Sequence, residues 1–281
     1  MRTRTLRPLV LAALAGSLLF ATACKRDKDA APDEDITSAE DHSDGERETA
    51  FSADIVSAAA PQDETQTGSA AVSPEAIGRV YGRCATRTYN ADARTLTIDF
   101  GPTNCLCPDG KLRRGKIVVV FTGSDLRRHS GAVVTRENYF VNDNQHTATR
   151  IFTGLGNGSF SVAVTGASII FANNGGTSSW TANRTCTMTA GFGTPQVSDD
   201  VYSVVGQAQG TNRRGVSYTA TVGTPLIKRG DCYKYFTAGT VTIANSNGKT
   251  LLLNYDPSGT GGCDNVASVT VNGRTKIITL R

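Results

Sequence analysis

The chain has 281 residues, 39% of them hydrophobic, and its 29 basic and 25 acidic residues give a formal net charge of +4. This composition allows a hydrophobic core. The net charge hides a split into −10 over residues 25–77 and +11 over residues 78–281, and nucleic acid is not expected as a partner. The apolar run from Leu9 to Ala23 is too short to span about 30 Å of hydrocarbon comfortably, so we do not expect a transmembrane helix.

The N-terminal segment is typical of a bacterial lipoprotein signal peptide. Residues 1–23 begin with three arginines, continue with an apolar run and end in small residues directly before Cys24. This pattern resembles a lipobox and predicts that residues 1–23 are removed and that Cys24 carries the lipid, palmitate included. The alternative is an ordinary secretory signal cleaved after Ala23, because Ala21 stands where a lipobox usually has Leu.

The next segment, residues 24–77, is predicted to be a disordered acidic tether that starts at the lipidated Cys24. After that cysteine it holds fourteen acidic residues against four basic ones, with Phe51 as its only aromatic residue, so it lacks the apolar surface to form a core. A single helical turn at residues 73–76 is the only helix that we consider. Lys25 resembles the residues that permit sorting to the outer membrane, on a face that the sequence leaves open.

Residues 78–281 predict one all-β domain. Short segments with alternating apolar residues are separated by Gly and Asn turns, as in residues 95–100, 159–164 and 215–222. The short connections predict an antiparallel meander of roughly a dozen strands. So wide a sheet is expected to be strongly curled, to split into a sandwich or to form a partly closed barrel. Residues 117–121 (IVVVF) are apolar on both faces, so we expect a central strand covered on each side.

Six cysteines in this domain predict three disulfides in an oxidising compartment. Spacing favours a bridge from Cys84 to Cys105 and another from Cys232 to Cys263, which leaves Cys107 to pair with Cys186. A metal site is not expected, because the single residue between Cys105 and Cys107 is not the usual zinc spacing.

Three strings in the domain carry a family resemblance: TIDFGPTNCLCPDGKLRRGKIVVVFTG (97–123), ENYFVND (137–143) and CDNVASVTVNGRTKIITL (263–280). They resemble uncharacterised outer-membrane lipoproteins of Bacteroidota over most of residues 84–281. The resemblance implies an exported, lipid-anchored β protein, and it implies no activity.

Catalytic candidates are few. His42 falls in the predicted tether, and His129 and His146 are expected in solvent-exposed loops. No Gly-x-Ser-x-Gly or His-Glu-x-x-His motif occurs. We therefore predict no catalytic residue and no cofactor. The alternatives are a hydrolase of envelope polysaccharide, which would use the carboxylates of Asp99, Asp199, Asp200 or Asp256, and a lipid carrier with a large apolar cavity.

Basic clusters in the turns give the stronger functional signal. If turns at one end of the sheet lie side by side, their charges merge into a rim that attracts anionic polysaccharide or lipopolysaccharide. One alternative is that these residues only keep the sheet soluble, and another is that the acidic tether folds back and screens them. We predict a non-enzymatic binding or structural module in the envelope. The candidate anion-binding residues are Lys111, Arg113, Arg114, Lys116, Arg127, Arg128, Arg213, Arg214, Lys228 and Arg229.

Overall fold

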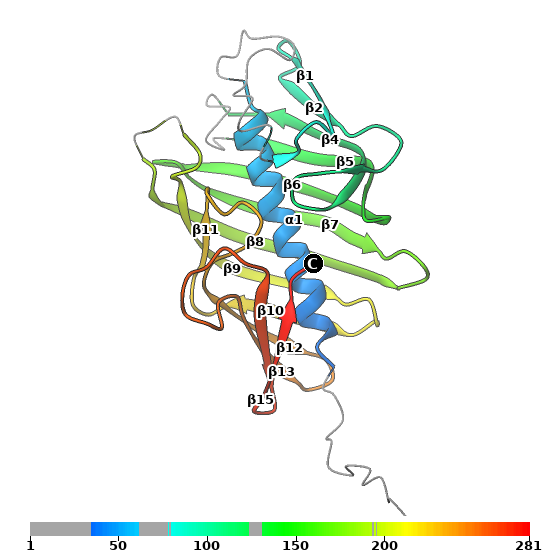
Figure 1. Cartoon of the computed structure of the whole chain (residues 1–281), viewed down its shortest axis with the longest axis vertical. Coiled ribbons are helices and arrows are strands. Elements are labelled where there is room, and N and C mark those ends of the chain that lie inside the picture. The colour runs from blue at the N-terminus through cyan, green and yellow to red at the C-terminus, as the bar shows by residue number, and fades with distance from the viewer. Residues whose placement is uncertain (1–34, 62–77, 79, 124–130, 193, 195) are drawn as a thin grey trace, which may run out of the picture. The chain divides into compact units, whose positions relative to one another are not determined.

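The computed structural model describes residues 35–61, 78, 80–123, 131–192, 194 and 196–281, and residues 35–281 form one compact unit (Figure 1). The signal peptide, Cys24, the helical turn at residues 73–76, Arg127, Arg128 and His129 lie outside the described residues. In the described part of the chain, no helix combines the length and apolar composition needed to cross a bilayer.

Fifteen strands of the described chain form one antiparallel sheet. Its strands follow chain order from β1 to β15, except that β3 pairs only with β4 and β11 only with β9. The strands are β1 (Thr86–Asn90), β2 (Thr95–Asp99), β3 (Cys105–Leu106), β4 (Leu112–Phe121), β5 (Gly131–Val141), β6 (Asn144–Gly156), β7 (Ser159–Ile170), β8 (Thr177–Ala190), β9 (Val201–Thr211), β10 (Ser217–Val222), β11 (Leu226–Arg229), β12 (Thr240–Asn245), β13 (Thr250–Asn254), β14 (Val266–Val271) and β15 (Arg274–Thr279).

The predicted antiparallel meander is confirmed, but the predicted closure is wrong. The sheet neither curls strongly nor forms a sandwich or a barrel, and β1 and β15 remain at its two ends. Alternation holds as the sequence indicates: Leu96 and Ile98 of β2 are buried while Thr95 and Thr97 are partly exposed. The sheet stays open because a helix covers its apolar side, so its strands need not close on one another to bury that side.

Strand β4 corrects one expectation about the core. It lies inside the sheet, between β2 and β5, as the IVVVF run predicts. Only one of its faces is fully covered, however: Ile117 and Val119 are buried, whereas Val120 remains 39% exposed. The run is apolar on both faces without being packed on both.

Two predicted Asn-Gly turns are confirmed at hairpins. Asn157 and Gly158 connect β6 to β7 with φ values of 48° and 73°, and Asn272 and Gly273 connect β14 to β15 with values of 51° and 75°. Asparagine and glycine tolerate this left-handed conformation, which matches the twist of the paired strands. The turns therefore fix the register of both hairpins.

The predicted disordered tether is wrong for its central part, which forms the helix α1 (Thr37–Ala59). Seventeen of its 23 residues are buried, polar and charged ones among them. This helix could not be recognised in the sequence because it is buried on all sides. Carboxylates occupy buried positions as well, so α1 has no apolar stripe of helical period. At the C-terminal end of α1, Arg87 of β1 donates from Nε to the carbonyl of Ala59 at 2.6 Å.

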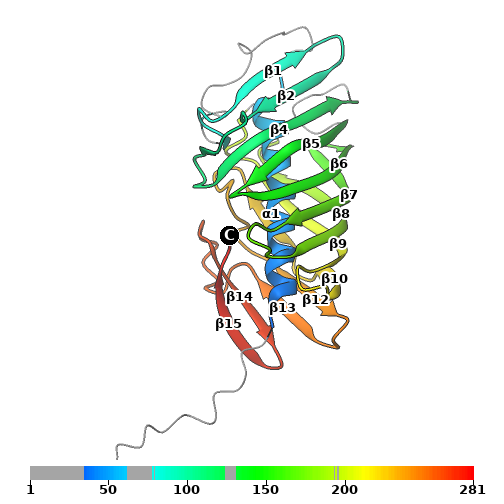
Figure 2. The same ribbon diagram turned by 90° about the vertical axis from the view of Figure 1, so that its right-hand side faces the viewer.

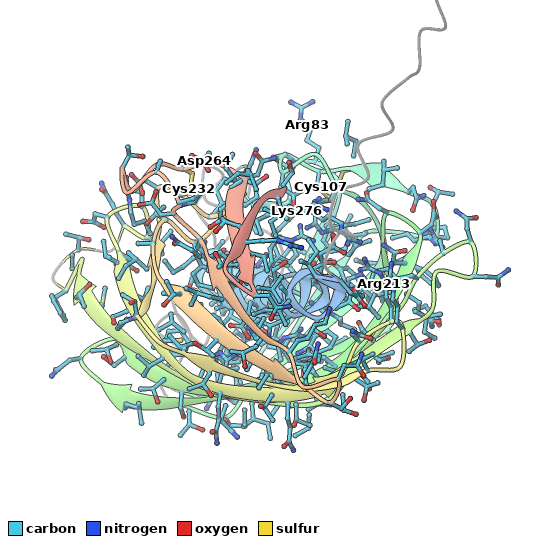
Figure 3. The ribbon with its side chains drawn as sticks, turned by 90° about the horizontal axis from the view of Figure 1, so that it is seen from below. Arg83, Cys107, Arg213, Cys232, Asp264 and Lys276 are labelled. Atoms are coloured by element: carbon cyan, nitrogen blue, oxygen red, sulfur yellow. A yellow bond between two sulfur atoms is a disulfide. The ribbon has the colours of Figure 1, made fainter. Side chains whose placement is uncertain are left out.

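The helix runs across the strands along the concave side of the sheet. Figure 2 shows the strands following one another along α1, and Figure 3 looks along the helix with the sheet bent around it. A 23-residue helix is about 34 Å long. At about 4.8 Å between neighbouring strands, α1 covers about seven of them. The helix thereby brings its carboxylates to residues from many different strands.

Candidate functional site

The two halves of α1 differ in chemistry. Residues 37–49 (TSAEDHSDGERET) contain one apolar side chain, Ala39, whereas the second half contributes Phe51, Ile55 and Val56 to the core. We call residues 37–49 the polar half. Because Ala39 is its one apolar side chain, the attachment of the polar half to the sheet depends mainly on polar contacts.

Those contacts are ion pairs with cations from distant strands and loops. We call the α1-facing side of the sheet that carries Arg136, Arg150, Arg184, Arg213 and Lys228 the basic face. The pairs between the helical segment and the rest of the chain are Asp35 with Arg214, Glu40 with Arg213 and Arg281, Asp41 with Arg213, Asp44 with Arg281, Glu46 with Arg184, Glu48 with Arg136, and Asp54 with Lys228.

The pair of Glu46 and Arg184 is bidentate and buried. Arg184 donates from Nε to Oε2 of Glu46 at 2.9 Å and from Nη2 to Oε1 at 2.5 Å. Burial alone would raise the pKa of Glu46, but the charge of Arg184 and its hydrogen bonds hold that pKa below its usual value. Both groups are therefore charged at neutral pH.

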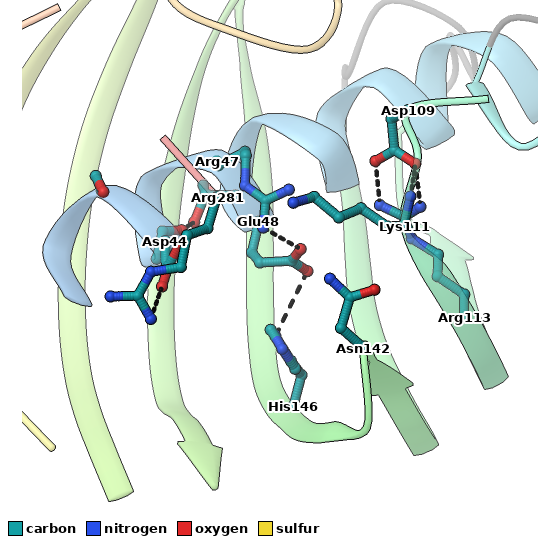
Figure 4. A network of polar contacts seen from close by, with 12 residues as sticks. Asp44, Arg47, Glu48, Asp109, Lys111, Arg113, Asn142, His146 and Arg281 are labelled. Carbon is teal, nitrogen blue, oxygen red and sulfur yellow. Dashed lines mark hydrogen bonds and ion pairs between the residues drawn. The ribbon is translucent and has the colours of Figure 1, made fainter. Parts of the chain in front are cut away.

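Glu48 lies at the centre of a second cluster (Figure 4). Its Oε2 accepts a hydrogen bond from Arg136 Nη2 at 2.8 Å and lies 3.7 Å from Nδ1 of His146, while Arg47 is 3.8 Å from Oε1. Burial lowers the pKa of His146 to about 3, so the imidazole is neutral. The expectation of a solvent-exposed loop histidine was wrong, because His146 is an inward-facing residue of β6 and only 4% exposed.

Arg113, a candidate anion-binding residue, has a structural role. It donates from both η nitrogens to Asp109, at 2.6 and 2.7 Å, and from Nε to the Tyr139 hydroxyl at 3.0 Å. Its guanidinium also lies 4.1 Å from the centre of the Phe51 ring of α1. These contacts leave no free edge of Arg113 for a ligand.

The remaining candidate cations also face carboxylates. Arg114 pairs with Asp143, Lys116 with Asp99 at 3.2 Å, and Arg229 with Asp231 at 2.5 Å, while Lys111 is close enough to Asp109 and Asp44 for both to affect its pKa. Three others pair with the helical segment, namely Arg213, Arg214 and Lys228. The structure thus confirms in part the alternative in which the acidic segment folds back on the basic residues.

Two of the three predicted disulfides are confirmed, with Cα distances of 5.4 Å between Cys84 and Cys105 and 5.6 Å between Cys232 and Cys263. The predicted third pair is wrong: Cys107 and Cys186 are buried thiols. Cys107 adjoins β4 and Cys186 lies in β8, and β5, β6 and β7 separate these strands. Four strand spacings of about 4.8 Å put the two roughly 19 Å apart, far beyond disulfide reach.

The sizes and linings of the cavities are relevant to the two alternative functions, a lipid carrier and a hydrolase. Beneath α1, the spaces that Cys186 and Asp200 line measure only about 60 Å³ and 40 Å³ respectively, too small for a lipid chain. A larger hollow, about 680 Å³ and open, lies on the opposite side of the sheet and has no carboxylate or other charged residue in its lining. Neither alternative, a lipid carrier or a hydrolase, gains support from these spaces.

The candidate carboxylates of a hydrolase serve local structure. Asp256 accepts backbone hydrogen bonds from Thr260 and Gly261 in one turn, and Asp199 accepts from the Thr194 hydroxyl in another. Within the described ranges, no group of three or more His, Cys, Asp and Glu side chains is arranged to hold a metal ion.

Comparisons with protein-family models, with curated proteins and with solved structures find no match. The basic face therefore has to be interpreted from its own chemistry. Sequence reasoning missed Arg136, Arg150 and Arg184 because it considered clusters in turns. The available signal was a single arginine at an inward-facing position of an otherwise apolar strand face, as in Trp180, Ala182, Arg184 and Cys186 of β8.

Proposed function

We propose that the protein is a lipid-anchored, non-enzymatic binding protein of the bacterial envelope, which takes an anionic polysaccharide on its basic face. The polar half of α1 occupies this face and acts as an internal competitor. The observation that carries the proposal is the match between a buried helical segment without apolar anchors and the cations Arg136, Arg184 and Arg213, which hold its carboxylates.

Energetics support displacement of this half. The attraction within a buried ion pair is little larger than the free energy needed to remove its two charges from water. The pairs therefore hold the polar half in place but add little net stability. Gly45, in the middle of it, disfavours helix by about 1 kcal/mol relative to alanine. Phe51, Ile55 and Val56 bury apolar surface and anchor the second half. The polar half is therefore the part of α1 that opens at the lowest cost.

The opened face suits an anionic polymer. Release of the polar half uncovers Arg184 and Arg213 beside the rings of Trp180 and Tyr218, which pack under α1. Guanidinium groups bind carboxylates and phosphates through paired hydrogen bonds, and aromatic rings pack against sugar faces. A polymer replaces several α1 carboxylates at once, and its affinity falls as salt rises.

The test measures binding of dextran sulfate to the mature chain, with uncharged dextran as the matched probe. Glu46→Gln removes one α1 carboxylate, weakens the closed form and is expected to raise the affinity for dextran sulfate about tenfold, equivalent to about 1.4 kcal/mol. Adding Arg184→Gln to that variant removes a ligand-binding cation and is expected to cancel the gain. Arg274→Gln, which changes an exposed residue of β15, is the control and leaves binding unchanged.

Trp180 provides the second readout, since it is the one tryptophan of the chain and packs against Gly45. Saturating dextran sulfate is expected to shift its fluorescence to longer wavelength as the polar half leaves. Equal affinity of wild type and Glu46→Gln, or binding without a change at Trp180, contradicts the proposal. The lipid anchor is tested separately, because metabolic palmitate labelling is expected in the wild type and absent from Cys24→Ser.

The hollow on the opposite side of the sheet favours a second candidate, binding of a neutral polysaccharide. Its lining includes Ser179, Thr181, Gln209 and Thr219, which offer hydroxyl and amide groups and no charge. Such groups match sugar hydroxyls as donors and acceptors. Binding of uncharged dextran that is insensitive to salt and lost in Gln209→Leu would favour this candidate over the basic face.

A further inference from the structure

Arg150 is a buried cation that forms no ion pair with α1 among the described residues. It comes from the middle of β6, is 0% exposed, and donates from Nε to the Thr49 hydroxyl at 3.4 Å. Its two η nitrogens have no hydrogen-bond partner among the described residues. A buried guanidinium without an anionic partner costs several kcal/mol, so this group calls for a compensating charge.

Further donors beside Arg150 lack partners as well. Nε and Nη1 of Arg136, Nε of Arg47 and Nδ1 of His146 have no hydrogen-bond partner within the described ranges. Arg136 and His146 come from β5 and β6, and both contact Glu48. The unpaired nitrogens therefore come from the neighbouring strands β5 and β6 and from α1 itself, around Glu48.

The nearby carboxylates already pair with other cations, although Oε1 of Glu48 has no hydrogen-bond partner among the described residues. Asp109 receives both η nitrogens of Arg113, and Glu46 receives Nε and Nη2 of Arg184. Glu48 is shared by Arg136, Arg47 and His146 (Figure 4). The arginines of this cluster are Arg47, Arg113, Arg136 and Arg150, and its carboxylates are Glu48 and Asp109. Positive charge is thus in excess where water has the least access.

Only a small side chain stands between His146 and Arg150 on the inward face of β6. On β6 the inward-facing residues run His146, Ala148 and Arg150, so the residue between the imidazole and the guanidinium contributes only a methyl group. The paired N–H groups of a guanidinium present a fork that suits a compact anion.

We infer that a small inorganic anion binds beneath α1, held by Arg136 and Arg150 with His146 at its edge. The site forms in the closed protein, so it does not depend on binding of a polymer to the basic face. Bound anion links β5 and β6 to the polar half of α1 through the shared cluster. Its removal leaves the guanidinium of Arg150 without a counter-charge and destabilises the closed form.

The experiment follows thermal unfolding of the mature chain in gluconate, an anion too large for the site, at constant ionic strength. Chloride or phosphate then replaces gluconate stepwise. Saturable stabilisation is expected, with a rise of roughly 5 to 10 °C when the anion reaches one hundred times its dissociation constant. The chloride and phosphate titrations show which of the two the site accepts.

Arg150→Met keeps the length of the side chain and removes the charge, and it is expected to abolish the anion-dependent rise. Arg274→Gln, which changes an exposed residue of β15, is the matched control and retains it. If the stability of the wild type depends on neither anion, water satisfies these donors and the inference is overturned. An equal rise in Arg150→Met also overturns it. If Arg150→Met does not fold, bromide soaked into crystals of the wild type decides: an anomalous peak between Arg136 and Arg150 supports the site, and its absence overturns it.

Discussion

Gly45 of α1 packs directly against the indole ring of Trp180. A Cβ atom at position 45 would lie 2.8 Å from Cε2 of that ring, closer than such atoms approach in real proteins. The indole is rigid and only 5% exposed, so it has little room to give way. The glycine that weakens the helix is thus the residue that lets the helix reach the sheet.

Gly45→Ala is therefore expected to destabilise the protein although alanine favours helix by about 1 kcal/mol. The steric conflict with Trp180 outweighs that gain, and the expected loss is about 1 to 3 kcal/mol. Urea unfolding followed by Trp180 fluorescence measures it. Ser43→Ala also raises helix propensity and meets no such ring, so it should change stability by no more than about 0.5 kcal/mol. A more stable Gly45→Ala would show that the close contact is not maintained.

A double-mutant cycle tests the pair of Glu46 and Arg184. Either Glu46→Gln or Arg184→Gln leaves one buried charge without its partner and is expected to cost about 3 to 5 kcal/mol in the free energy of unfolding. The double variant buries no charge at this position and should lose clearly less than the sum of the two. Additive losses in urea unfolding would mean that the two side chains do not interact in the folded protein.

The pH dependence of stability reports on His146. Burial lowers its pKa to about 3, so the folded protein holds a neutral imidazole while the unfolded chain takes up a proton near pH 6.5. The contribution of His146 to the free energy of unfolding is fully present above pH 6.5 and is lost as the pH falls toward 3. His146→Gln removes this proton uptake on unfolding. The slope of the free energy of unfolding against pH should therefore fall by about 1.4 kcal/mol per pH unit between about pH 6 and 4.

The effects of other titrating groups on this slope cancel when the wild type is compared with His146→Gln. His42, whose pKa burial lowers to about 4, acts in the same direction as His146, and Asp44, whose pKa burial raises to about 6, acts in the opposite direction. Both are present in the wild type and in His146→Gln, so the difference between the two slopes isolates His146. An exposed histidine would give equal slopes in urea unfolding at each pH.

Alkylation tests the two unpaired cysteines. In a Cys24→Ser chain under non-reducing conditions, iodoacetamide should modify two thiols after unfolding and none before, because Cys107 and Cys186 are buried. Burial also raises the pKa of Cys186 to about 12, which suppresses the reactive thiolate. Cys186 shares a small cavity with Glu46 and Thr49, so Glu46→Gln should make it react faster than Cys107. Mass spectrometry that finds three bridges would contradict this assignment.

The sequence by itself determined the antiparallel meander, the faces of its strands and two of its three predicted disulfides. These depend on local signals: alternation in residues 95–99, left-handed turns at Asn157 and Asn272, and cysteine spacings that bracket single hairpins. Whether Cys24 carries a lipid is a further prediction from local pattern, and palmitate labelling tests it.

Only the tertiary structure decided that residues 37–59 form a helix and that the arginines of β5, β6 and β8 share one face beneath it. An acidic run is usually solvated when read alone, since no apolar period marks its burial. Glu46 and Arg184 are separated by 138 positions, and only the stacking of the strands along α1 brings them together. Long-range charge pairing replaces the hydrophobic periodicity from which a helix is ordinarily predicted, which is why α1 could not be found from the sequence.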